Sequence, residues 1–271
     1  MKKGVLIYDK SDAEYNKWFI NKIISTGVEF DLDIELKITE EIGNIDDLNI
    51  YDFAIVRNRK PEMSENLESK GIRCFNSSYV CKIGNDKWEM YKDFSAAGIP
   101  VMYTQSSKLP FPCVVKPKHG HGGQNVFLVK NTDEYNNILE NNNISNTDVQ
   151  NDYIFQMPAS EIGRDIRVYV VGDMILSAIE RTASDGEKDF RANFSLGGMA
   201  KEYALNDDEL KIAAKVANHI KADFVGIDLI YNNGKPIVNE IEDAVGTRML
   251  YASTDIDPVY EYVSWISRCL E

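Results

Sequence analysis

The stretch that most constrains the fold runs from Phe224 to Gly246, where the pattern predicts two strands joined by a tight turn. Apolar residues alternate along its first half, and an Asn-Asn-Gly sequence typical of hairpin turns follows. The returning apolar run ends at two acids, Glu240 and Glu242. Residues two apart in a strand share a face, so these acids point the same way, and Asp228 on the partner strand can join them.

Three carboxylates on one face of a sheet are costly unless a positive charge lies between them. Hard oxygen ligands in this arrangement suit Mg²⁺, which proteins often hold through one or two carboxylates together with phosphate oxygens. The alternative is an exposed sheet face with scattered acids. The metal site is favoured because Asp and Glu are otherwise depleted in apolar strands. We therefore expect Asp228, Glu240 and Glu242 to be metal ligands.

Composition and charge exclude several classes of function. The chain has 271 residues, enough for two domains or one large one, with a formal charge of −13 and a pI near 4.8. This charge argues against a general nucleic-acid binder, whose affinity comes largely from Lys and Arg on phosphates. No apolar run has the length of a membrane span, and no signal-peptide cleavage site follows the N-terminus, so we expect a cytoplasmic protein. The four cysteines show no CxxC spacing and are expected to be reduced thiols.

Residues 1–80 are predicted to form a small α/β domain. Four apolar runs typical of buried strands lie at residues 5–8, 34–38, 53–56 and 71–76. The spacing between Glu14 and Thr26 is helical, and strands that alternate with helices indicate a parallel sheet. No glycine fingerprint follows the first strand, so dinucleotide binding is not supported. Arg57 and Arg59 follow the third strand, where ligand crevices often form, although solvated surface arginines fit the pattern equally well.

A glycine-rich hairpin between residues 111 and 129 is the second strong signal. An apolar strand ends near Lys116, and a loop that contains Gly120, Gly122 and Gly123 leads into another strand. Such a loop exposes backbone N–H groups and lets a phosphate approach closely. It is not a P-loop, because it has no Gly-Lys-Ser/Thr sequence and does not lead into a helix. A buried Lys116 needs an anionic partner; otherwise its ammonium group reaches solvent.

The other elements follow from periodicity. We expect one helix from Ser78 to Ala97, with Asp86 and Lys87 inside it, and a polar surface loop from Asn141 to Asp152. Further helices are predicted at residues 132–140, 207–220 and 257–270, and strands at 153–158 and, as a hairpin, 163–181.

A polar stretch without periodicity runs from residue 181 to 198. We expect a long loop there, of the kind that often carries function. Its Arg181, Arg191 and Asn193 could meet an anion.

Several short motifs occur in a definite order: Asp165-Ile166-Arg167, Ile179-Glu180-Arg181, Asp189-Phe190-Arg191-Ala192-Asn193, Gly197-Gly198, Val225-Gly226-Ile227-Asp228 and Asn239-Glu240. In this order and spacing, residues 76–271 resemble the RimK-like ligases of the ATP-grasp superfamily. The resemblance implies an α/β (α+β) ATP-grasp fold, with a small parallel α/β domain at 1–80 and the ATP-grasp domain at 81–271. A lid subdomain at about 100–155 and a mixed-sheet C-terminal subdomain at about 156–271 would sandwich ATP.

The resemblance also implies roles for individual residues. Those implied to bind ATP are Lys87, Lys116, Gly120, Gly122, Gly123, Gln156, Met157, Glu161, Asp165, Arg191 and Asn193. Within this set the lysines contact phosphates, the glycines close over the terminal phosphate, and Asp165 approaches the ribose. Those implied to act in catalysis are Lys116, Arg191 and Asn193. Those implied to hold Mg²⁺, as two ions with Mn²⁺ as an alternative, are Asp228, Glu240 and Glu242.

The implied reaction is ATP-dependent carboxylate–amine ligation. A carboxylate attacks the γ-phosphate of ATP to give an acyl phosphate, and an amine then displaces phosphate to form an amide or peptide bond. The implied partners are ATP, small carboxylate and amine substrates of amino-acid or peptide type, and a second copy of the chain, with no nucleic acid or membrane. A small-molecule kinase and a non-catalytic nucleotide-binding protein remain alternatives, because both can use the same nucleotide architecture.

The sequence departs from the family pattern near the metal site. Glu242 stands where Asn is usual, which adds charge, although a carboxylate can still bind Mg²⁺. The segment after it normally borders the acceptor site, and here Ala-Val-Gly replaces Ser-Pro-Gly, so the substrates stay open. Arg57, Arg59 and Arg248 are candidate anchors for a substrate carboxylate, with surface salt bridges as the alternative. The expected adenine slot also differs, since Met157 follows Gln156 where Glu is common.

Overall fold

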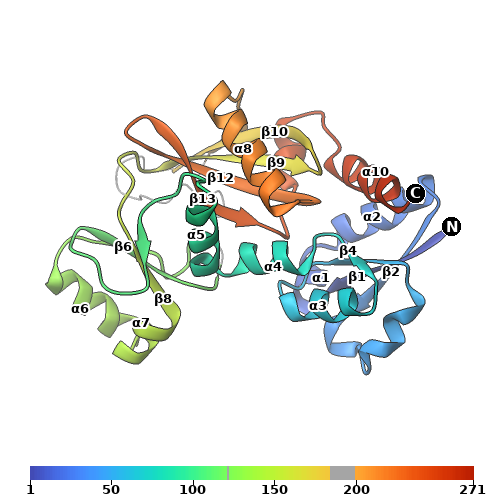
Figure 1. Cartoon of the computed structure of the whole chain (residues 1–271), viewed down its shortest axis with the longest axis horizontal. Coiled ribbons are helices and arrows are strands. Elements are labelled where there is room, and N and C mark those ends of the chain that lie inside the picture. The colour runs from blue at the N-terminus through green and yellow to red at the C-terminus, as the bar shows by residue number, and fades with distance from the viewer. Residues whose placement is uncertain (121, 184–198) are drawn as a thin grey trace.

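The computed structural model describes residues 1–120, 122–183 and 199–271. In these residues the strands form three sheets, which occupy three successive parts of the chain. Figure 1 shows the first sheet at one end of the molecule, the small second sheet at the other end, and the third sheet between them.

The first sheet is parallel, as the alternation of strands and helices predicts. Its order is β2-β1-β3-β4, and its strands are β1 (Lys2–Tyr8), β2 (Leu32–Ile38), β3 (Phe53–Val56) and β4 (Arg73–Cys74). The connecting helices are α1 (Lys10–Tyr15), α2 (Lys17–Glu29) and α3 (Pro61–Ser69), with the 3₁₀ turns η1 (Thr39–Glu41) and η2 (Ile45–Ile50) before β3. The buried residues of α2 pack with those of β1 and β2 in one cluster, while η2 and α3 contribute to another. Helices thus cover both faces of this sheet.

The single helix expected from Ser78 to Ala97 is wrong. The structure has two helices, α4 (Ser78–Asn85) and α5 (Lys87–Ala96), separated by Asp86. Asp86 has an extended backbone, and its carboxylate accepts a hydrogen bond from the Glu89 N–H, so it caps α5. The break places Lys87 in the first turn of a helix.

The second sheet has the order β5-β8-β6-β7 and contains the predicted glycine-rich hairpin. Its strands are β5 (Thr104–Gln105), β6 (Cys113–Pro117), β7 (Phe127–Val129) and β8 (Tyr153–Gln156), and the helices α6 (Thr132–Asn141) and α7 (Asn146–Asp152) lie beside it. The expected loop over 141–152 is therefore wrong, because α7 forms within it. A capping box between Ser145 and Asp148 satisfies the first N–H groups of this short polar helix.

The third sheet is antiparallel, with the order β11-β10-β9-β12-β13. Its strands are β9 (Arg164–Val171), β10 (Met174–Thr182), β11 (Met199–Glu202), β12 (Phe224–Asn232) and β13 (Lys235–Glu242), and α8 (Asp207–Ile220) follows β11. The hairpin predicted from the opening stretch is confirmed. Its register places Asp228 opposite Glu240 and Gly226 opposite Glu242.

Alternation along β12 divides its side chains between two faces. Val225, Ile227 and Leu229 pack with apolar residues of α4, α5 and α8. Phe224 faces the other way and packs with the C-terminal helix α10 (Pro258–Leu270). Asp228 lies on the Phe224 side, so the face that carries the carboxylates is covered by α10 at one end and is free to form a site farther along.

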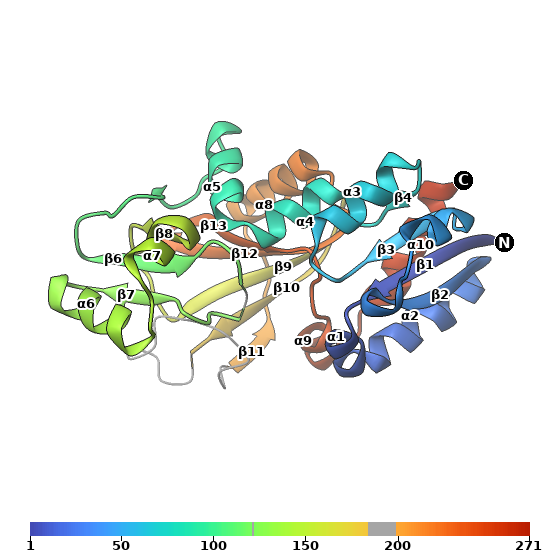
Figure 2. The same cartoon turned by 90° about the horizontal axis from the view of Figure 1, so that it is seen from below.

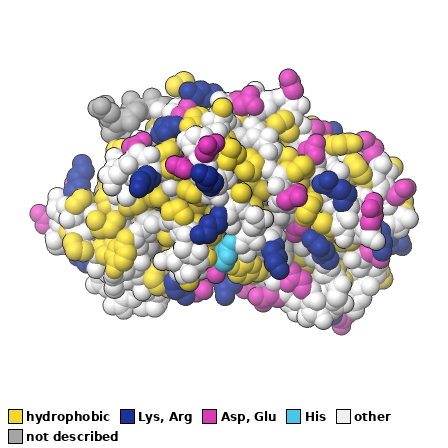
Figure 3. Space-filling model, turned by 45° about the horizontal axis from the view of Figure 1, so that its top comes forward, with side chains coloured by type: hydrophobic (Ala, Val, Ile, Leu, Met, Phe, Trp, Pro, Cys, Tyr) yellow, Lys and Arg dark blue, Asp and Glu magenta, His cyan; other side chains and the backbone are white. Residues whose placement is uncertain are grey.

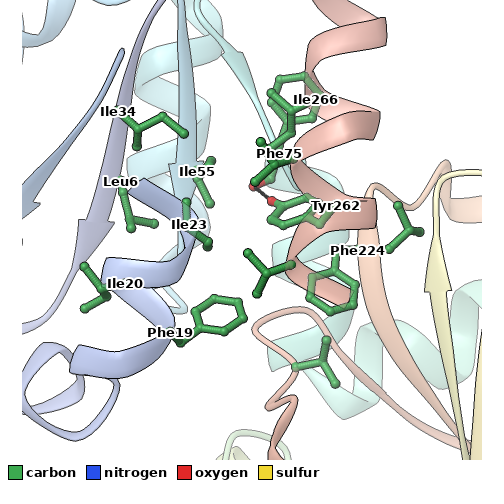
Figure 4. Packing of buried hydrophobic residues seen from close by; sticks show 14 of the residues in the cluster. Leu6, Phe19, Ile20, Ile23, Ile34, Ile55, Phe75, Phe224, Tyr262 and Ile266 are labelled. Atoms are coloured by element: carbon green, nitrogen blue, oxygen red, sulfur yellow. Dashed lines mark hydrogen bonds between the residues drawn. The ribbon is translucent and has the colours of Figure 1, made fainter. Parts of the chain in front are cut away.

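The C-terminal helix also joins the first sheet to the third. Tyr262 and Ile266 of α10 belong to one cluster of buried residues with Ile23 of α2 and Phe224 of β12 (Figure 4). Tyr262 donates a 2.7 Å hydrogen bond to the carbonyl of Phe75. Figure 2 shows α10 beside α2, with the short helix α9 (Arg248–Ser253) near α1. This packing fixes the carboxyl end of the first sheet against the end of β13.

Figure 3 shows one face of the surface, where Lys and Arg side chains are interspersed with Asp and Glu. Among the described residues, no helix combines the length and the apolar character that a membrane span requires.

Candidate active site

The three carboxylates that the sequence singles out converge. Asp228, Glu240 and Glu242 each offer an oxygen, and these oxygens lie within 4.8 Å of one another. Asp228 is buried and the two glutamates are half-buried. Three carboxylate oxygens at this spacing on a rigid hairpin fit a divalent cation of the hard, oxygen-preferring kind.

Two arginines neutralise the buried member of this group. Both oxygens of Asp228 accept hydrogen bonds from Arg167 of β9, at 2.7 Å each, and Arg181 of β10 donates a further one at 2.7 Å. Arg167 also donates to Glu242 at 3.2 Å. Arg181 binds Asp165 through two hydrogen bonds of 2.6 Å. The positive charge that three clustered acids require is thus supplied from two neighbouring strands.

These contacts set the protonation of the buried acids. Burial acts to raise the pKa of Asp228, but the guanidinium groups of Arg167 and Arg181 outweigh it and lower the pKa to about 2. Burial raises the pKa of Asp165 to about 6, because Arg181 compensates it only in part and the charge of Asp228 opposes ionisation. Asp228 is therefore the firmly ionised carboxylate of the pair.

Two lysines approach the same carboxylates from the other side. Lys87 Nζ lies 2.8 Å from Glu240 Oε1 and also donates to the carbonyl of Gly120. Lys116 Nζ donates a 2.7 Å hydrogen bond to the Tyr91 hydroxyl, which in turn donates to the carbonyl of Asn239 at 2.6 Å. Burial lowers the pKa of Lys116 to about 7, with Lys87 adding to the effect and Glu240 opposing it.

The local structure explains why these lysines meet. Lys87 begins α5 just after the Asp86 cap, and its N–H donates to the carbonyl of Lys118 at 2.9 Å. This contact ties the start of α5 to the chain that follows β6. Lys116 lies in β6, whose neighbours are buried apolar residues, so its ammonium group stays inside and does not reach solvent. Lys116 is only 5% exposed, which decides between the two readings that its sequence allows.

A cavity opens beside the two lysines, and we call it the lysine cavity. Its polar lining includes nine residues predicted to bind nucleotide or metal: Lys87, Lys116, Gly120, Gly123, Gln156, Glu161, Asp165, Asp228 and Glu240. Its apolar walls come from Val114, Val126, Leu128, Ile162 and Ile230. An apolar slot with cations at one end suits a planar base with a phosphate chain.

Two predicted nucleotide residues do not line the lysine cavity. The Met157 side chain is 40% exposed, while its backbone N–H donates to the carbonyl of Tyr103 at 3.0 Å. Gly122 lines a second cavity on the other side of the carboxylates. Arg191 and Asn193 lie outside the described residues, as do the other residues of the 184–198 stretch and His121.

The second cavity, which we call the arginine cavity, is lined by four arginines, Arg57, Arg167, Arg181 and Arg248. Its wall also includes aromatic residues of α1 and α2 and the segment Val245 to Met249. Asp228 and Glu240 line both cavities. The carboxylate group is therefore the partition between a mixed apolar and cationic slot and a cavity rich in arginine.

Sequence reasoning missed the part played by Arg167. Its signal is visible in retrospect, since Asp165 and Arg167 alternate with buried apolar residues in β9 and so share one face. The structure also brings Arg57 to the cavity, whereas Arg59 turns away and pairs with Asp12 at 2.9 Å.

Comparison with known proteins agrees with this geometry. The model of the RimK-like ATP-grasp domain matches residues 90–266. A probable alpha-L-glutamate ligase of Mannheimia succiniciproducens is 29% identical over 214 residues, which cover 74% of this chain and 70% of that protein. The glutamate–LysW ligase ArgX of Sulfolobus acidocaldarius is 28% identical over 235 residues, with coverage of 81% and 83%.

Among solved structures, the D-cycloserine synthetase DcsG superposes with a TM-score of 0.75 at 16% identity, covering 99% of this chain and all of that one. The likeness confirms the fold expected from the sequence. The chain belongs to the RimK-like ATP-grasp family, and it is an ATP-dependent carboxylate–amine ligase.

Proposed function

We propose that this ligase joins an acidic amino acid, glutamate or a close analogue, to a second molecule through an amide bond. The supporting observation is the carboxylate partition, with lysines and an apolar slot on one side and four arginines on the other. ATP binds in the lysine cavity, and the acidic substrate binds in the arginine cavity. The names of two relatives, a probable alpha-L-glutamate ligase and a glutamate–LysW ligase, support glutamate as the substrate.

In this proposal the residues of the lysine cavity hold the nucleotide. Lys87 and Lys116 bind its phosphates, and the backbone of the loop at Gly120, Gly122 and Gly123 covers the terminal one. Gln156, Met157 and Glu161 border the base, and Asp165 approaches the ribose. Asp228, Glu240 and Glu242 would hold Mg²⁺, which would supply positive charge to neutralise the transferred phosphoryl group.

Nucleotide binding exchanges internal ion pairs for external ones. Lys87 now pairs with Glu240, so binding a phosphate to Lys87 leaves Glu240 free to bind a cation. Glu242 is likewise paired with Arg167 and would exchange this contact for a cation. Lys87 and Arg167 therefore have anionic partners in the free protein and would keep one when ligands bind.

The substrate carboxylate attacks the γ-phosphorus of ATP, ADP leaves, and an acyl phosphate forms. An amine then attacks the acyl carbon, and phosphate carries away the electrons of the broken C–O bond. Lys116 stabilises negative charge on the phosphoryl group, and Arg191 and Asn193 are proposed to orient the reacting carboxylate. Arg181, held by Asp165 and Asp228, supplies fixed positive charge on the substrate side.

We further propose the division expected from the sequence, with domains at 1–80 and 81–271 and a lid at about 100–155. The cytoplasmic location and self-association remain predictions. The four cysteines are free thiols, which supports a reducing compartment.

The test is turnover with Mg²⁺, ATP, glutamate and a panel of amino acids and peptides, with and without hydroxylamine. Release of ADP and phosphate with an amide that contains glutamate is expected. Hydroxylamine traps an acyl phosphate as a hydroxamate and identifies the donor carboxylate. A stable phosphorylated product with no amide or hydroxamate would contradict the proposal and favour a kinase.

A further inference from the structure

The first sheet has a crevice position that the nucleotide site does not use. In the order β2-β1-β3-β4, the chain leaves β1 toward one edge of the sheet and later returns to β3 on the other side. Ligands of open parallel sheets bind at such a switch point, outside the carboxyl ends of the strands. Tyr8 is the last residue of β1 and Arg57 directly follows β3, so both lie at this point.

Arg57 is buried there without a counterion. It is 7% exposed, and its guanidinium carbon lies 4.6 Å from the centre of the Phe19 ring. One nitrogen, Nη2, donates to the carbonyl of Val245 at 2.9 Å. Among residues 1–120, 122–183 and 199–271, no carboxylate forms a salt bridge with Arg57, and its Nε has no hydrogen-bond partner. A buried cation in this condition costs free energy that an anion would recover.

A second unpaired group lies beside it. In the described part of the chain, three buried side-chain atoms lack a hydrogen-bond partner, and the Tyr8 hydroxyl and Arg57 Nε are two of them. The Arg57 guanidinium lies 5.9 Å from the centre of the Tyr8 ring. Burial raises the pKa of Tyr8, so its hydroxyl keeps its proton and can donate. The Arg57 guanidinium opposes this rise, so the Tyr8 hydroxyl interacts with Arg57, and of the two residues only Arg57 lines the arginine cavity.

Comparison with the other arginines of the same sheet shows that the missing counterion is particular to Arg57. Arg59, two residues away, pairs with Asp12 at 2.9 Å, and Arg73 of β4 pairs with Asp223 at 3.0 Å. Each of these has a carboxylate of the chain itself. Arg57 alone of the three lines the arginine cavity, which has a volume of about 420 Å³.

The arginine cavity connects the unpaired charge of Arg57 with the carboxylate partition. The cavity lining also includes Glu240, Glu242 and Arg181, where the reacting groups of the proposed function lie. Arg248 on its rim donates to a carbonyl of Tyr15 and stacks on that ring at 3.9 Å, with no carboxylate partner among the residues described. A substrate that reaches the partition can therefore place a second, negatively charged group toward Arg57.

We propose that Arg57, positioned by Tyr8, binds a non-reacting carboxylate of the substrate at the switch point of the first sheet. The inference rests on the proposed function in one respect, that a substrate occupies the arginine cavity. A site of this kind selects substrates that carry a second carboxylate besides the reacting group. Residues of the N-terminal sheet would then determine this selectivity. The carboxylate accepts from the Arg57 guanidinium where it lines the cavity, so this cation gains the anionic partner that it lacks in the described chain.

The first experiment measures binding without turnover. The probes are glutamate, glutarate and, as a neutralised control, glutamine, titrated into wild-type protein, Arg57→Met, Tyr8→Phe and the matched Arg59→Met by calorimetry. Arg57→Met is expected to weaken glutamate and glutarate about tenfold or more, and Tyr8→Phe by a smaller factor. Arg59→Met should bind as wild type does. Equal affinity of wild type and Arg57→Met, or no binding of either dicarboxylate to wild type, would overturn the inference.

Tyr8→Phe guards against a folding defect in Arg57→Met. It removes only an unpaired hydroxyl from a buried ring, so its melting temperature without ligand should equal or exceed that of wild type. Its loss of dicarboxylate affinity then reports on the site alone. Unchanged affinity in this variant would remove Tyr8 from the proposal.

Turnover separates this inference from the proposed function. If glutamate is ligated, Arg57→Met should raise its KM with little change in the KM for ATP, and wild type should prefer glutamate to glutamine more strongly than the variant does. If calorimetry shows dicarboxylate binding that depends on Arg57 but no amide forms, the proposed function fails and the anion site stands. If an amide forms and wild type and Arg57→Met have the same KM for glutamate, the proposed function stands and the anion site fails.

Discussion

The two cavities that meet at Asp228 and Glu240 differ in how their cations are compensated. On the lysine side, Lys87 already has Glu240 at 2.8 Å, and Lys116 is held by the Tyr91 hydroxyl. On the arginine side, Arg167 and Arg181 share Asp228 at the partition, but Arg57 has no carboxylate. Carboxylates of the chain thus compensate Lys87, Arg167 and Arg181, whereas Lys116 is held by a hydroxyl and Arg57 by a carbonyl.

The difference separates two ways of binding an anion. Where an internal carboxylate is present, a phosphate must displace it, so binding is an exchange that also frees a metal ligand. Where none is present, an anion relieves a cost that the folded protein already carries. The first arrangement couples nucleotide binding to metal binding. The second increases the affinity for a substrate that carries an additional negative charge.

The largest expected effect concerns the carboxylate common to both cavities. Glu240→Gln removes a metal ligand and the partner of Lys87 together, so we expect amide formation to fall by at least about 10²–10³-fold. The fold should persist, because Glu240 is half-buried on a strand end and Gln keeps its shape. Steady-state turnover and circular dichroism test this. Exposed Glu202→Gln on β11 is the control, and near-normal activity of Glu240→Gln would refute the metal assignment.

Asp228→Asn removes a proposed metal ligand and should also lower stability. It leaves Arg167 and Arg181 buried without their shared anion, and breaking such a network costs about 3–5 kcal/mol. Urea unfolding of the variant should show this loss, while exposed Asp208→Asn on α8 should change little. A loss below about 1 kcal/mol would mean that the arginines find other partners, and the partition would then be less rigid than its contacts indicate.

The lysine side should respond to pH through Lys116. Burial lowers its pKa to about 7 from 10.5, so above pH 7 the free protein holds a neutral amine. Phosphates favour the ammonium form, so ATP binding takes up a proton and weakens by up to about tenfold per pH unit above 7. Calorimetry in buffers of different ionisation enthalpy measures this uptake. Lys116→Arg, which stays protonated, should show none.

The same shift has a consequence for stability. Between pH 7 and 10.5 the unfolded chain binds more protons at Lys116 than the folded protein does. The contribution of this group to the free energy of unfolding therefore rises with pH across that window. Lys116→Met should flatten this slope in a pH series of urea unfolding curves.

Local sequence pattern was enough to predict the helices and strands whose bounds are set by their own residues. The expected helix 207–220 is α8 with the same bounds, because an Asn206 capping box starts it and Lys221, with a positive φ, ends it. The two acids of β13 share a face by strand periodicity, and the hairpin turn that joins β12 to β13 was also predictable. The pairing with Asp228 was not predictable, because the turn register alone would place Asp228 opposite Asn239, and a β-bulge shifts the register so that Asp228 lies opposite Glu240.

Contacts between distant parts of the chain could not be predicted from the sequence. Arg167 meets Asp228 across 61 positions and Arg57 meets the Val245 carbonyl across 188, and no local pattern encodes such pairings. The break at Asp86 was missed for a different reason, because an Asp within helical periodicity fits a solvated face as well as an N-cap. The site was therefore predictable as a list of acids and lysines, but not as two cavities with unequal compensation.

The smallest effect is expected from the residue that departs from the family pattern. Glu242 receives one 3.2 Å hydrogen bond from Arg167, whose stronger contacts go to Asp228. Glu242→Asn keeps an oxygen ligand and removes one negative charge, so activity should stay within about tenfold of wild type. Glu242→Ala, which removes the ligand as well, is the matched comparison and should lose more. Turnover measured over a series of Mg²⁺ concentrations separates the two contributions. If Glu242→Asn is as inactive as Glu242→Ala, the charge itself is required, and Arg167 would then be held between two carboxylates of equal importance.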